Sequence, residues 1–279
     1  MFGFKKAPKA APETGVISAR VGTSKIVVQN LTKIYQRKNS SVTAIQNASL
    51  EILENEFVCI VGPSGCGKST LLRILAGLDE ATTGKILIDD HPINGPGADR
   101  GMVFQSYTLF PWLTVEDNIR FGLKIKKMPK QQADEIVEQY LDIIGLKAFR
   151  KSFPKELSGG MKQRVAIARA LANSPKVLLM DEPFGALDSQ TKSQMQLLMR
   201  EIWQVEKPTV VFITHDIEEA VFLSSRVYVM SARPSRMVAN LSVLLSYKRN
   251  LDLKEQPEFQ QYRHQITKLL HEQTETSVG

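Results

Sequence analysis

Short apolar runs recur along the chain, separated by segments rich in glycine, proline and charged residues. An apolar run bounded by turn residues is typical of a strand that is covered on both faces. Runs of this kind predict strands at residues 26–28, 44–52, 57–61, 84–88, 177–182 and 209–214, with a further short segment at 101–105 after the turn Gly95-Pro96-Gly97. They favour an α/β fold, in which helices flank a sheet.

Apolar residues spaced three and four apart predict helices elsewhere. The clearest case is residues 129–145, which begin with proline, end with glycine and place their apolar residues on one face. Similar patterns predict helices at 71–76, closed by Gly77, at 165–172 and at 257–271. In the last of these, one side carries Phe259, Tyr262, Ile266 and Leu269.

The patterns divide the chain into three parts. Residues 1–24 are rich in Lys, Ala, Pro and Gly without periodicity, which predicts a flexible basic tail. Residues 25–240 form the main domain, into which a helical subdomain is inserted at about residues 106–172. Residues 241–279 form a C-terminal helical extension.

Composition narrows the class of protein. With 279 residues, 43% hydrophobic and 23% charged, the chain can bury a sizeable core and is not disordered as a whole. No apolar run approaches the roughly 18 residues that cross a bilayer. The net charge of +7 suits nucleic acid or an anionic membrane surface without choosing between them. Cys59 and Cys66 are the only cysteines, which fits a reducing compartment without disulfides.

A glycine-rich loop supplies the most specific chemistry. It lies between the predicted strand at 57–61 and the helix at 71–76, and its residues are Gly62, Pro63, Ser64, Gly65, Cys66, Gly67, Lys68, Ser69 and Thr70. This GxxxxGKS pattern is a P-loop, whose backbone amides and following helix cradle nucleotide phosphates. Lys68 is then expected to reach the β- and γ-phosphates, and Ser69 to bind Mg²⁺. Cys66 is interpreted as a small residue that fills the loop.

Two further groups carry candidate chemistry. Asp181 and Glu182 end the apolar strand at 177–182, where Asp181 would hold Mg²⁺ and Glu182 would position a water. Two acids after a strand are by themselves also consistent with a solvated turn. Ser158, Gly159 and Gly160 begin a helix and could form a second anion site, or an ordinary helix cap. Because the P-loop already serves one nucleotide's phosphates, a second cradle implies a nucleotide held by another subunit.

Taken together, these motifs resemble those of the ATP-binding subunits of ABC transporters over about residues 26–240. The P-loop, the Asp181-Glu182 pair and the LSGG signature at 157–160 occur in the family's order. Further matches are Tyr35, Gln105, Asp188 and His215, at the positions of the family's aromatic A-loop, Q-loop, D-loop and switch histidine. The resemblance implies an ABC ATPase fold: a mixed sheet core flanked by helices, an inserted α-helical subdomain and an antiparallel β subdomain.

The resemblance also implies roles for these residues. Tyr35 would stack on the adenine of ATP, and a surface aromatic beside an edge strand is the alternative for a tyrosine seen alone. Gln105 would touch Mg²⁺ and the attacking water while linking the core to the helical subdomain. His215 would contact the γ-phosphate and steady Glu182, which would be the base or water anchor. Lys68 would support catalysis, and Asp188 would contribute to the nucleotide site.

The partners implied are a second ATPase subunit, identical or not, and a separate permease. Two ATP molecules would be clamped in a head-to-tail dimer, each between one P-loop and the opposite Ser158-Gly159-Gly160. The permease would contact the apolar segment at residues 107–115, where Trp112 is the strongest candidate and internal packing is the alternative for any single residue. A periplasmic solute-binding protein would act indirectly. The location implied is the cytoplasmic face of the inner membrane.

The amino-acid sequences of several segments resemble those of importer ATPases for nitrate, sulfonates and taurine, a group that includes bicarbonate systems. These segments are 101–115, the stretch LSGGMKQR with Met161, and 232–236. The expected function is therefore ATP-driven uptake of a small anion, with nitrate or nitrite favoured and sulfonate, taurine or bicarbonate as alternatives. A nucleic-acid-associated ABC ATPase is a remote alternative, because residues 105–128 contain no sustained heptads.

Overall fold

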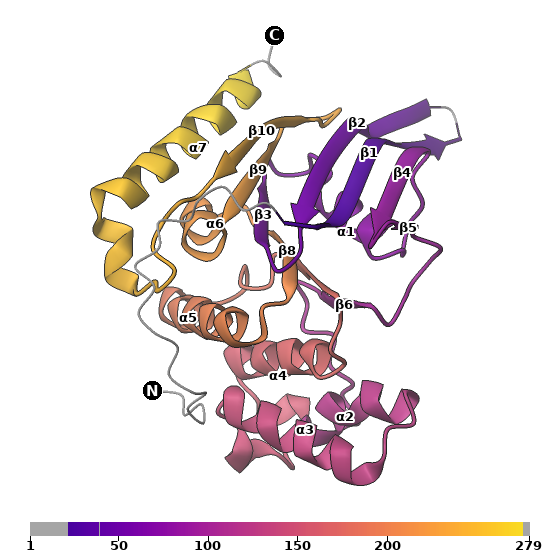
Figure 1. The fold of residues 1–279 in the computed structure, drawn as a ribbon, viewed down its shortest axis with the longest axis vertical. Coiled ribbons are helices and arrows are strands. Elements are labelled where there is room, and N and C mark those ends of the chain that lie inside the picture. Colours follow the sequence, from indigo (N-terminus) through magenta and orange to yellow (C-terminus); the bar gives the residue numbers. More distant parts are fainter. Residues whose placement is uncertain (1–21, 39, 276–279) are drawn as a thin grey trace.

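A computed structural model provides the structure of residues 22–38 and 40–275. The predicted tail at residues 1–24 lies almost wholly outside this part of the chain. The architecture has three regions: a six-stranded sheet with flanking helices, a four-stranded antiparallel sheet, and a separate group of helices (Figure 1). This arrangement confirms the predicted fold, a mixed sheet core with an inserted helical subdomain and an antiparallel β subdomain.

The six-stranded sheet has the order β10-β9-β3-β8-β7-β6, in which only β10 is antiparallel to its neighbour. Its strands are β3 (Phe57–Val61), β6 (Arg100–Val103), β7 (Val177–Asp181), β8 (Thr209–Ile213), β9 (Arg226–Met230) and β10 (Met237–Ser242). Every residue of β3 and β8 is buried, which is why both read as continuous apolar runs. The segment predicted at 101–105 ends early, so Gln105 lies in the loop after β6.

The antiparallel sheet has the order β2-β1-β4-β5. Its strands are β1 (Ser24–Arg37), β2 (Ser40–Leu53), β4 (Thr83–Ile88) and β5 (His91–Pro92). The strand predicted at 26–28 is present but is only part of β1, which has 14 residues and carries Tyr35 near its end. Register shifts interrupt its pairing with β2 at several points, and Asn30 and Asn47 have positive φ. These irregularities break the two-residue alternation that would have marked the whole strand.

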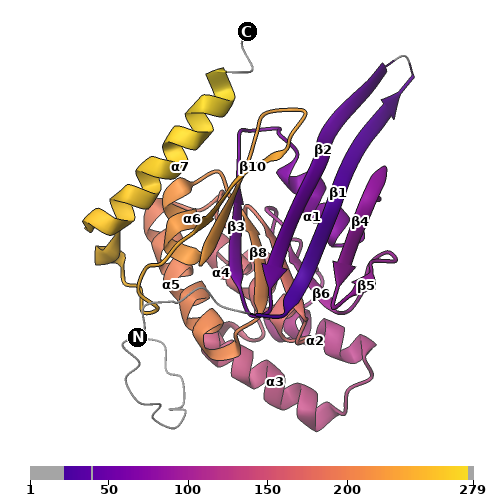
Figure 2. The ribbon, with the colours of Figure 1, turned by 45° about the horizontal axis from the view of Figure 1, so that its top comes forward.

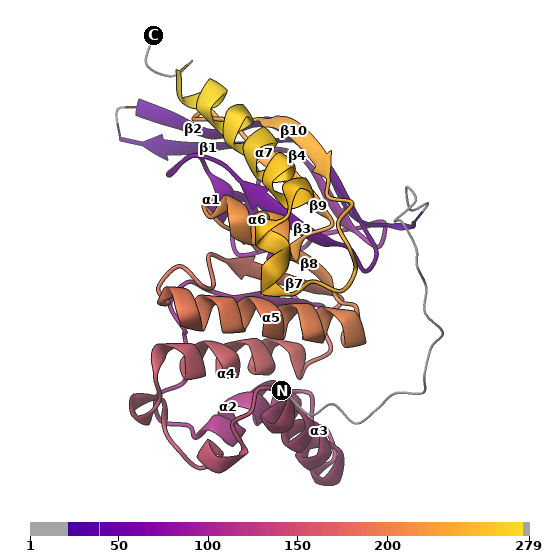
Figure 3. The ribbon, with the colours of Figure 1, turned by 90° about the vertical axis from the view of Figure 1, so that its left-hand side faces the viewer.

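Helices flank the six-stranded sheet and form the inserted subdomain. Those around the sheet are α1 (Lys68–Leu75), α5 (Ser189–Glu206), α6 (Ile217–Leu223) and α7 (Pro257–Glu275). The subdomain contains α2 (Val115–Ile125), α3 (Lys130–Ile143) and α4 (Gly159–Leu171). Figure 3 shows α4 lying along α5, so this pair joins the subdomain to the sheet region. Short 3₁₀ turns lie at Lys147–Phe149, Pro154–Glu156 and Leu251–Glu255.

Two apolar clusters meet at the parallel sheet. Phe57, Cys59 and Val61 of β3 belong to the cluster that includes the helices of the subdomain, whereas Val58 and Ile60 belong to the cluster beneath the antiparallel sheet and α1. Successive side chains of β3 thus point to opposite faces, as a strand requires. Both clusters include residues of β3 and β7, so packing on the two faces of the sheet holds the loops that follow these strands in place.

The C-terminal helix confirms its predicted pattern. Along α7, Phe259 and Ile266 are fully buried, while Tyr262 and Leu269 pack against the core from partly buried positions. The helix lies beside α6 on the side of the molecule away from the antiparallel sheet (Figure 2). Within the described residues, no helix is both long and apolar enough to cross a bilayer.

Candidate functional site

The loop between β3 and α1 has the geometry of a phosphate cradle. Gly65 has φ 72° and Gly67 φ 120°, conformations that favour glycine. A Cβ on Gly67 would also lie 3.3 Å from the carbonyl oxygen of Ala44, so this position is crowded as well as strained. The loop runs directly into the amino end of α1, whose free amides and dipole favour an anion.

Cys66 is part of the packing of this loop. Its side chain is buried, and a Cβ on Gly62 would lie 3.0 Å from its sulfur. Burial raises the pKa of the Cys66 thiol, so the sulfur stays protonated and unreactive at neutral pH. These contacts favour the interpretation of Cys66 as a small residue that fills the loop.

Lys68 is folded back onto the loop. Its Nζ donates hydrogen bonds to the carbonyl oxygens of Gly62, at 2.8 Å, and Pro63, at 3.0 Å, and the residue is buried. The ammonium group therefore lies inside the curve of the loop, where phosphate oxygens are expected in a P-loop. An anion in the cradle would give this cation a charged partner in place of two neutral carbonyls.

Ser69 and Asp181 come together from α1 and β7. The hydroxyl of Ser69 donates to Oδ1 of Asp181 at 2.9 Å, although the two residues are 112 positions apart in the chain. Burial raises the pKa of Asp181, and the neighbouring charge of Glu182 adds to this effect. A hydroxyl and a carboxylate held side by side are the oxygen donors that Mg²⁺ prefers, so these residues fit the ion.

Glu182 follows β7 in a conformation with φ 42°, which is uncommon for a residue with a side chain. Its Oε2 lies 2.9 Å from Nδ1 of His215, which follows β8. The Gln105 amide points to the same space, because a Cβ on Gly185 would lie 3.6 Å from its Nε2 and 3.7 Å from Oε2 of Glu182. The structure thus brings together three residues that are far apart in the sequence.

A pocket of about 210 Å³ lies over the loop. Its lining residues are Ser64, Gly65, Gly67, Lys68, Ser69, Thr70, Glu182 and Arg233. The loop and the first acidic residue after β7 therefore face one cavity, which places a carboxylate beside the phosphate cradle. The described residues that line it do not include Ser158, Gly159 or Gly160, which lie at the start of α4.

Ser158 and Asp188 both cap helices. Ser158 accepts a hydrogen bond from the backbone N–H of Met161 at the start of α4, and Asp188 accepts one from Thr191 at the start of α5. These hydrogen bonds to Thr191 lower the pKa of Asp188. The two helix starts are in contact, since a Cβ on Gly160 would lie 2.5 Å from Cγ2 of Thr191. Within one chain, Ser158 thus performs the ordinary capping role that its sequence also allowed.

Tyr35 lies on β1 and contacts both the first turn of α1 and the segment that follows the helix. It is 38% exposed, and its hydroxyl donates to Oδ2 of Asp79 at 2.8 Å and lies 3.4 Å from Oγ1 of Thr70, the residue after the GxxxxGKS motif. The ring is consequently attached to the segment that forms the cradle.

The apolar segment at 107–115 divides into exposed and packed residues. Trp112 is 70% exposed, whereas Val115 is buried. Phe110 packs on Phe121 with ring centroids 4.3 Å apart, and both line a pocket of about 460 Å³ between α2 and α4. Internal packing therefore accounts for Phe110 and Val115 but not for Trp112.

The sequence analysis gave no site role to Arg233 or Asp79. Arg233 donates a hydrogen bond to the carbonyl oxygen of Gly65 and lines the pocket over the loop. It lies three residues past the end of β9, which pairs with the P-loop strand β3. A basic residue soon after this strand was the signal that the sequence offered. Asp79 follows α1 and Gly77, and no motif marked it.

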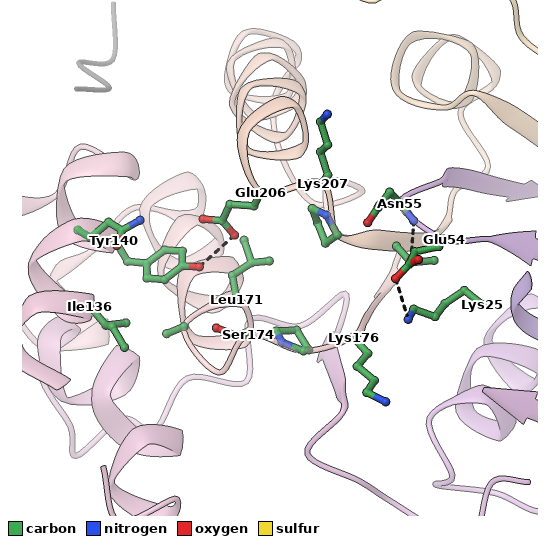
Figure 4. A pocket seen from close by; sticks show the side chains of 15 residues that line it. Lys25, Glu54, Asn55, Ile136, Tyr140, Leu171, Ser174, Lys176, Glu206 and Lys207 are labelled. Atoms are coloured by element: carbon green, nitrogen blue, oxygen red, sulfur yellow. Dashed lines mark hydrogen bonds and ion pairs between the residues drawn. The ribbon is translucent and has the colours of Figure 1, made fainter. Parts of the chain in front are cut away.

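A larger pocket of about 500 Å³ opens between α3 and the start of β8 (Figure 4). On one side of it the hydroxyl of Tyr140 donates to Glu206 at 3.1 Å, and on the other side Lys25 donates to Glu54 at 3.3 Å. It contains none of the predicted site residues, and it adjoins the amino ends of β7 and β8 while the P-loop follows the carboxyl end of β3. In parallel sheets, ligands bind at the carboxyl ends of strands, so the pocket over the loop is the candidate site.

Comparisons with known proteins agree with this geometry. The sequence profile of ABC transporters matches residues 45–185. An uncharacterized ABC transporter ATP-binding protein of Methanocaldococcus jannaschii is 50% identical over 91% of this chain and 94% of its own. The nitrate import ATP-binding protein of Synechocystis is 50% identical over 87% of this chain and 94% of its own. An aliphatic sulfonates import ATP-binding protein of Bacillus thuringiensis is 44% identical over 86% and 94%.

A solved structure is similar as well. It is a dimeric ATP-binding cassette in a post-hydrolysis state, bound to ADP and phosphate, and it is 35% identical to this chain with a TM-score of 0.69. The match covers 78% of this chain and 98% of the solved one. The sequence profile, the relatives and the phosphate cradle with its acidic pair lead to one conclusion: the chain belongs to the ABC transporter family and is an ATP-binding ATPase of that family.

Proposed function

We propose that this chain is the ATP-hydrolysing subunit of an importer that takes up a small anion, nitrate in the first place, through a separate permease. It would work at the cytoplasmic face of the inner membrane, and a periplasmic solute-binding protein would deliver the anion. The observation that carries the ATPase part is the placement of the Glu182–His215 pair beside the phosphate loop. The names of the relatives at 44–50% identity support the import part.

In this proposal, the backbone amides of residues 62–70 bind the phosphates of ATP, and Lys68 exchanges its carbonyl partners for phosphate oxygens. Ser69, Asp181 and Gln105 would hold Mg²⁺, which neutralises charge on the phosphates when it is bound. The Ser69–Asp181 hydrogen bond already places two of these oxygen donors together. Tyr35 would provide a stacking surface for adenine.

Glu182 would orient the attacking water and accept its proton. A carboxylate can do this only while it is ionised and correctly aimed, and the hydrogen bond to His215 fixes its Oε2. Gln105 would contact the same water, because its amide faces the space beside Glu182. His215 would act on the γ-phosphate as well as on Glu182, since its ring is more than half exposed toward solvent.

A second ATPase subunit completes the site in this proposal. Among the described residues, the lining of the phosphate pocket does not include Ser158, Gly159 or Gly160, which supports a role for them at the nucleotide of a partner. Asp188, at the neighbouring helix start, would face the same junction. The dimeric state of the similar cassette bound to ADP and phosphate supports this arrangement. Hydrolysis would remove contacts that join the two subunits and let them separate.

The permease would dock on the helical subdomain at residues 107–115. Trp112 is the large hydrophobic residue of this segment that is exposed, at 70%, and a large exposed aromatic surface is typical of a contact with another protein. The adjoining pocket between α2 and α4 would receive an apolar residue of the permease.

An aliphatic sulfonate is the second candidate cargo, because relatives named for sulfonate import are 44% identical over most of this chain. Taurine and bicarbonate are the other alternative solutes for the same importer. The ATPase subunit does not touch the solute, so the cargo has to be determined with the assembled transporter. A nucleic-acid partner has no support from the relatives described above.

The test uses the full chain assembled with its neighbouring permease and solute-binding protein in proteoliposomes. ATP hydrolysis is measured while nitrate, nitrite, taurine, an alkanesulfonate and bicarbonate are titrated separately. We expect stimulation by nitrate, together with ATP-dependent accumulation of nitrate in the lumen. Stimulation by a sulfonate alone would assign the second cargo, and a lack of hydrolysis under every condition would contradict the proposed function.

A further inference from the structure

Tyr35 is held by two charged neighbours that have no assigned role. Its hydroxyl donates to Oδ2 of Asp79 at 2.8 Å, while Nζ of Lys33 donates to the other oxygen of the same carboxylate at 2.6 Å. Lys33 also donates to the backbone carbonyl of Glu80 at 2.7 Å. The three side chains thus form one connected group, which joins β1 to the segment that follows α1.

Lys33 also determines which face of the Tyr35 ring is available. Its ammonium group lies over the ring, 4.8 Å from the centroid, as in a cation–π contact. The Lys33 and Asp79 side chains are only 12% and 20% exposed, whereas Tyr35 remains 38% exposed. The Lys33 ammonium group therefore covers one face of the ring, and the exposed surface belongs to the part of the ring that Lys33 does not cover.

This group is also attached to the phosphate cradle. The hydroxyl of Tyr35 lies 3.4 Å from Oγ1 of Thr70, so Tyr35, Asp79 and the residue after the GxxxxGKS motif are in contact. The Asp79 carboxylate carries a charge that its partners stabilise, because the hydrogen bonds from Lys33 and Tyr35 outweigh burial and lower its pKa. The Asp79 carboxylate is therefore ionised at neutral pH, and each of its two oxygens accepts a hydrogen bond.

We propose that Asp79 and Lys33 are positioning residues for the nucleobase: Asp79 fixes the edge of the Tyr35 ring, and Lys33 covers one face, so that the other face receives the base. This inference rests on the proposed stacking of Tyr35 on adenine. A ring that is already fixed loses little side-chain freedom when the base binds, so the clamp strengthens binding by preorganisation.

The test compares ATP with inorganic tripolyphosphate, which has the phosphates but no base. For Asp79→Asn and Lys33→Met, we expect ATP to bind more weakly by roughly 2- to 10-fold, the range for losing the order of one side chain. Tripolyphosphate should bind as tightly as it does to the original protein. KM for ATP should rise by the same factor while kcat stays near its original value.

Three further variants make the result interpretable. Tyr35→Phe keeps the ring but loses the bond to Asp79, so it should weaken ATP binding as Asp79→Asn does, and the double variant should add little to either. Tyr35→Ala removes the ring and should weaken ATP binding most. Asp89→Asn is the matched control: Asp89 also pairs with a lysine of β1, Lys25, at 2.7 Å, but it has no contact with Tyr35. It should leave both affinities unchanged.

Each outcome separates the inference from the proposed function. If Tyr35→Ala weakens ATP alone but Asp79→Asn and Lys33→Met do not, the clamp is overturned and the stacking role of Tyr35 stands. If Asp79→Asn weakens ATP and tripolyphosphate equally, the pair only supports the fold and the inference fails. If Tyr35→Ala does not change the ratio of the two affinities, the proposed stacking fails together with the clamp.

Discussion

At the scale of single residues, the candidate site depends on Glu182 being aimed by its surroundings. The residue adopts positive φ immediately after β7, and its carboxylate is bonded to His215. The side chain is only partly exposed, so the hydrogen bond restricts it further. The carboxylate is therefore fixed beside the phosphate loop before any nucleotide binds.

Replacing Glu182 by Gln tests this residue. The amide keeps the size of the side chain but cannot accept a proton from water, so phosphate release should fall by about 10²- to 10⁴-fold. ATP affinity, measured by equilibrium binding, should remain close to that of the original protein. Glu54→Gln, which alters a carboxylate paired with Lys25 away from the loop, should hydrolyse ATP normally. Phosphate release near the original rate in the Glu182 variant would remove it from its catalytic role.

The sequence located many of these residues, but not their contacts. The P-loop pattern is read from consecutive positions, which is why Gly65, Gly67 and Lys68 could be assigned directly. Ser69 and Asp181 are 112 positions apart, and they were expected to lie together because both were assigned to Mg²⁺. Arg233 and Asp79 were missed because neither belongs to a motif that assigns it to the site.

At the scale of elements, the signature helix α4 depends on close contact with α5. A Cβ on Gly160 would lie 2.5 Å from a methyl carbon of Thr191, which is closer than two carbons can approach. The serine cap of α4 and the aspartate cap of α5 lie at this contact. The glycines that look like an anion site in the sequence thus also allow two helices to meet.

This contact gives a prediction with a built-in rescue. Gly160→Ala should destabilise the protein by about 1–3 kcal/mol, as overpacking does in closely packed regions. The double variant with Thr191→Ser, which removes the methyl group but keeps the hydroxyl, should recover most of that loss in thermal unfolding. If Gly160→Ala is as stable as the original protein, or if Thr191→Ser gives no recovery, the close contact between α4 and α5 is not as described.

The antiparallel sheet should respond to acid through Asp89. Hydrogen bonds from Lys176 and then Lys25 lower the pKa of Asp89, so its folded value lies below the unfolded value of about 3.9. The stabilisation is therefore complete above that unfolded value and is lost as the pH falls through the folded pKa. Because Asp89 is partly exposed, screening limits the effect to at most about 1 kcal/mol.

Chemical denaturation as a function of pH checks this expectation. Asp89→Asn should lower the free energy of unfolding at pH 7, and the difference from the original protein should shrink as the pH falls below about 4. A difference that stays constant down to pH 2 would show that the charge of Asp89 contributes nothing.

The exposed segment before α2 gives a prediction about the contact with the permease. Trp112→Ala should reduce copurification of the permease, because a large exposed aromatic would lose its contact surface. Phe149→Ala is the matched control, since Phe149 is also an exposed aromatic of the helical subdomain, at 41% exposure. Equal copurification of the permease by the two variants would contradict the proposed docking surface.

The sequence predicted continuous, buried elements better than irregular ones. Strands β3, β7 and β8 are apolar on both faces, so their runs were visible. The strand β1 was found only in part, because shifts in its pairing with β2 disrupt the alternation. The long helix α5 was not predicted, since its buried face is formed by widely spaced residues such as Met195, Met199 and Trp203 among polar ones.

At the scale of the whole molecule, the central claim is that each nucleotide site is shared between two chains. The phosphate pocket and the signature Ser158-Gly159-Gly160 lie on the same chain, but the described lining of the pocket does not include the signature. A head-to-tail dimer would bring the pocket of one chain to the signature of its partner. Closure and opening of such a pair would then transmit hydrolysis to a permease.

The most direct test mixes two inactive variants. Lys68→Ala disables the phosphate loop and Ser158→Arg blocks the signature, so each variant alone should hydrolyse ATP at a small fraction of the original rate. If the sites are shared, a mixed dimer contains one site with both defects and one intact site, and mixing the two proteins should restore part of the activity. If the mixture is no more active than its separate components, each chain builds its site from its own residues alone, and the mixed dimer contains no intact site. That result would contradict the shared-site account.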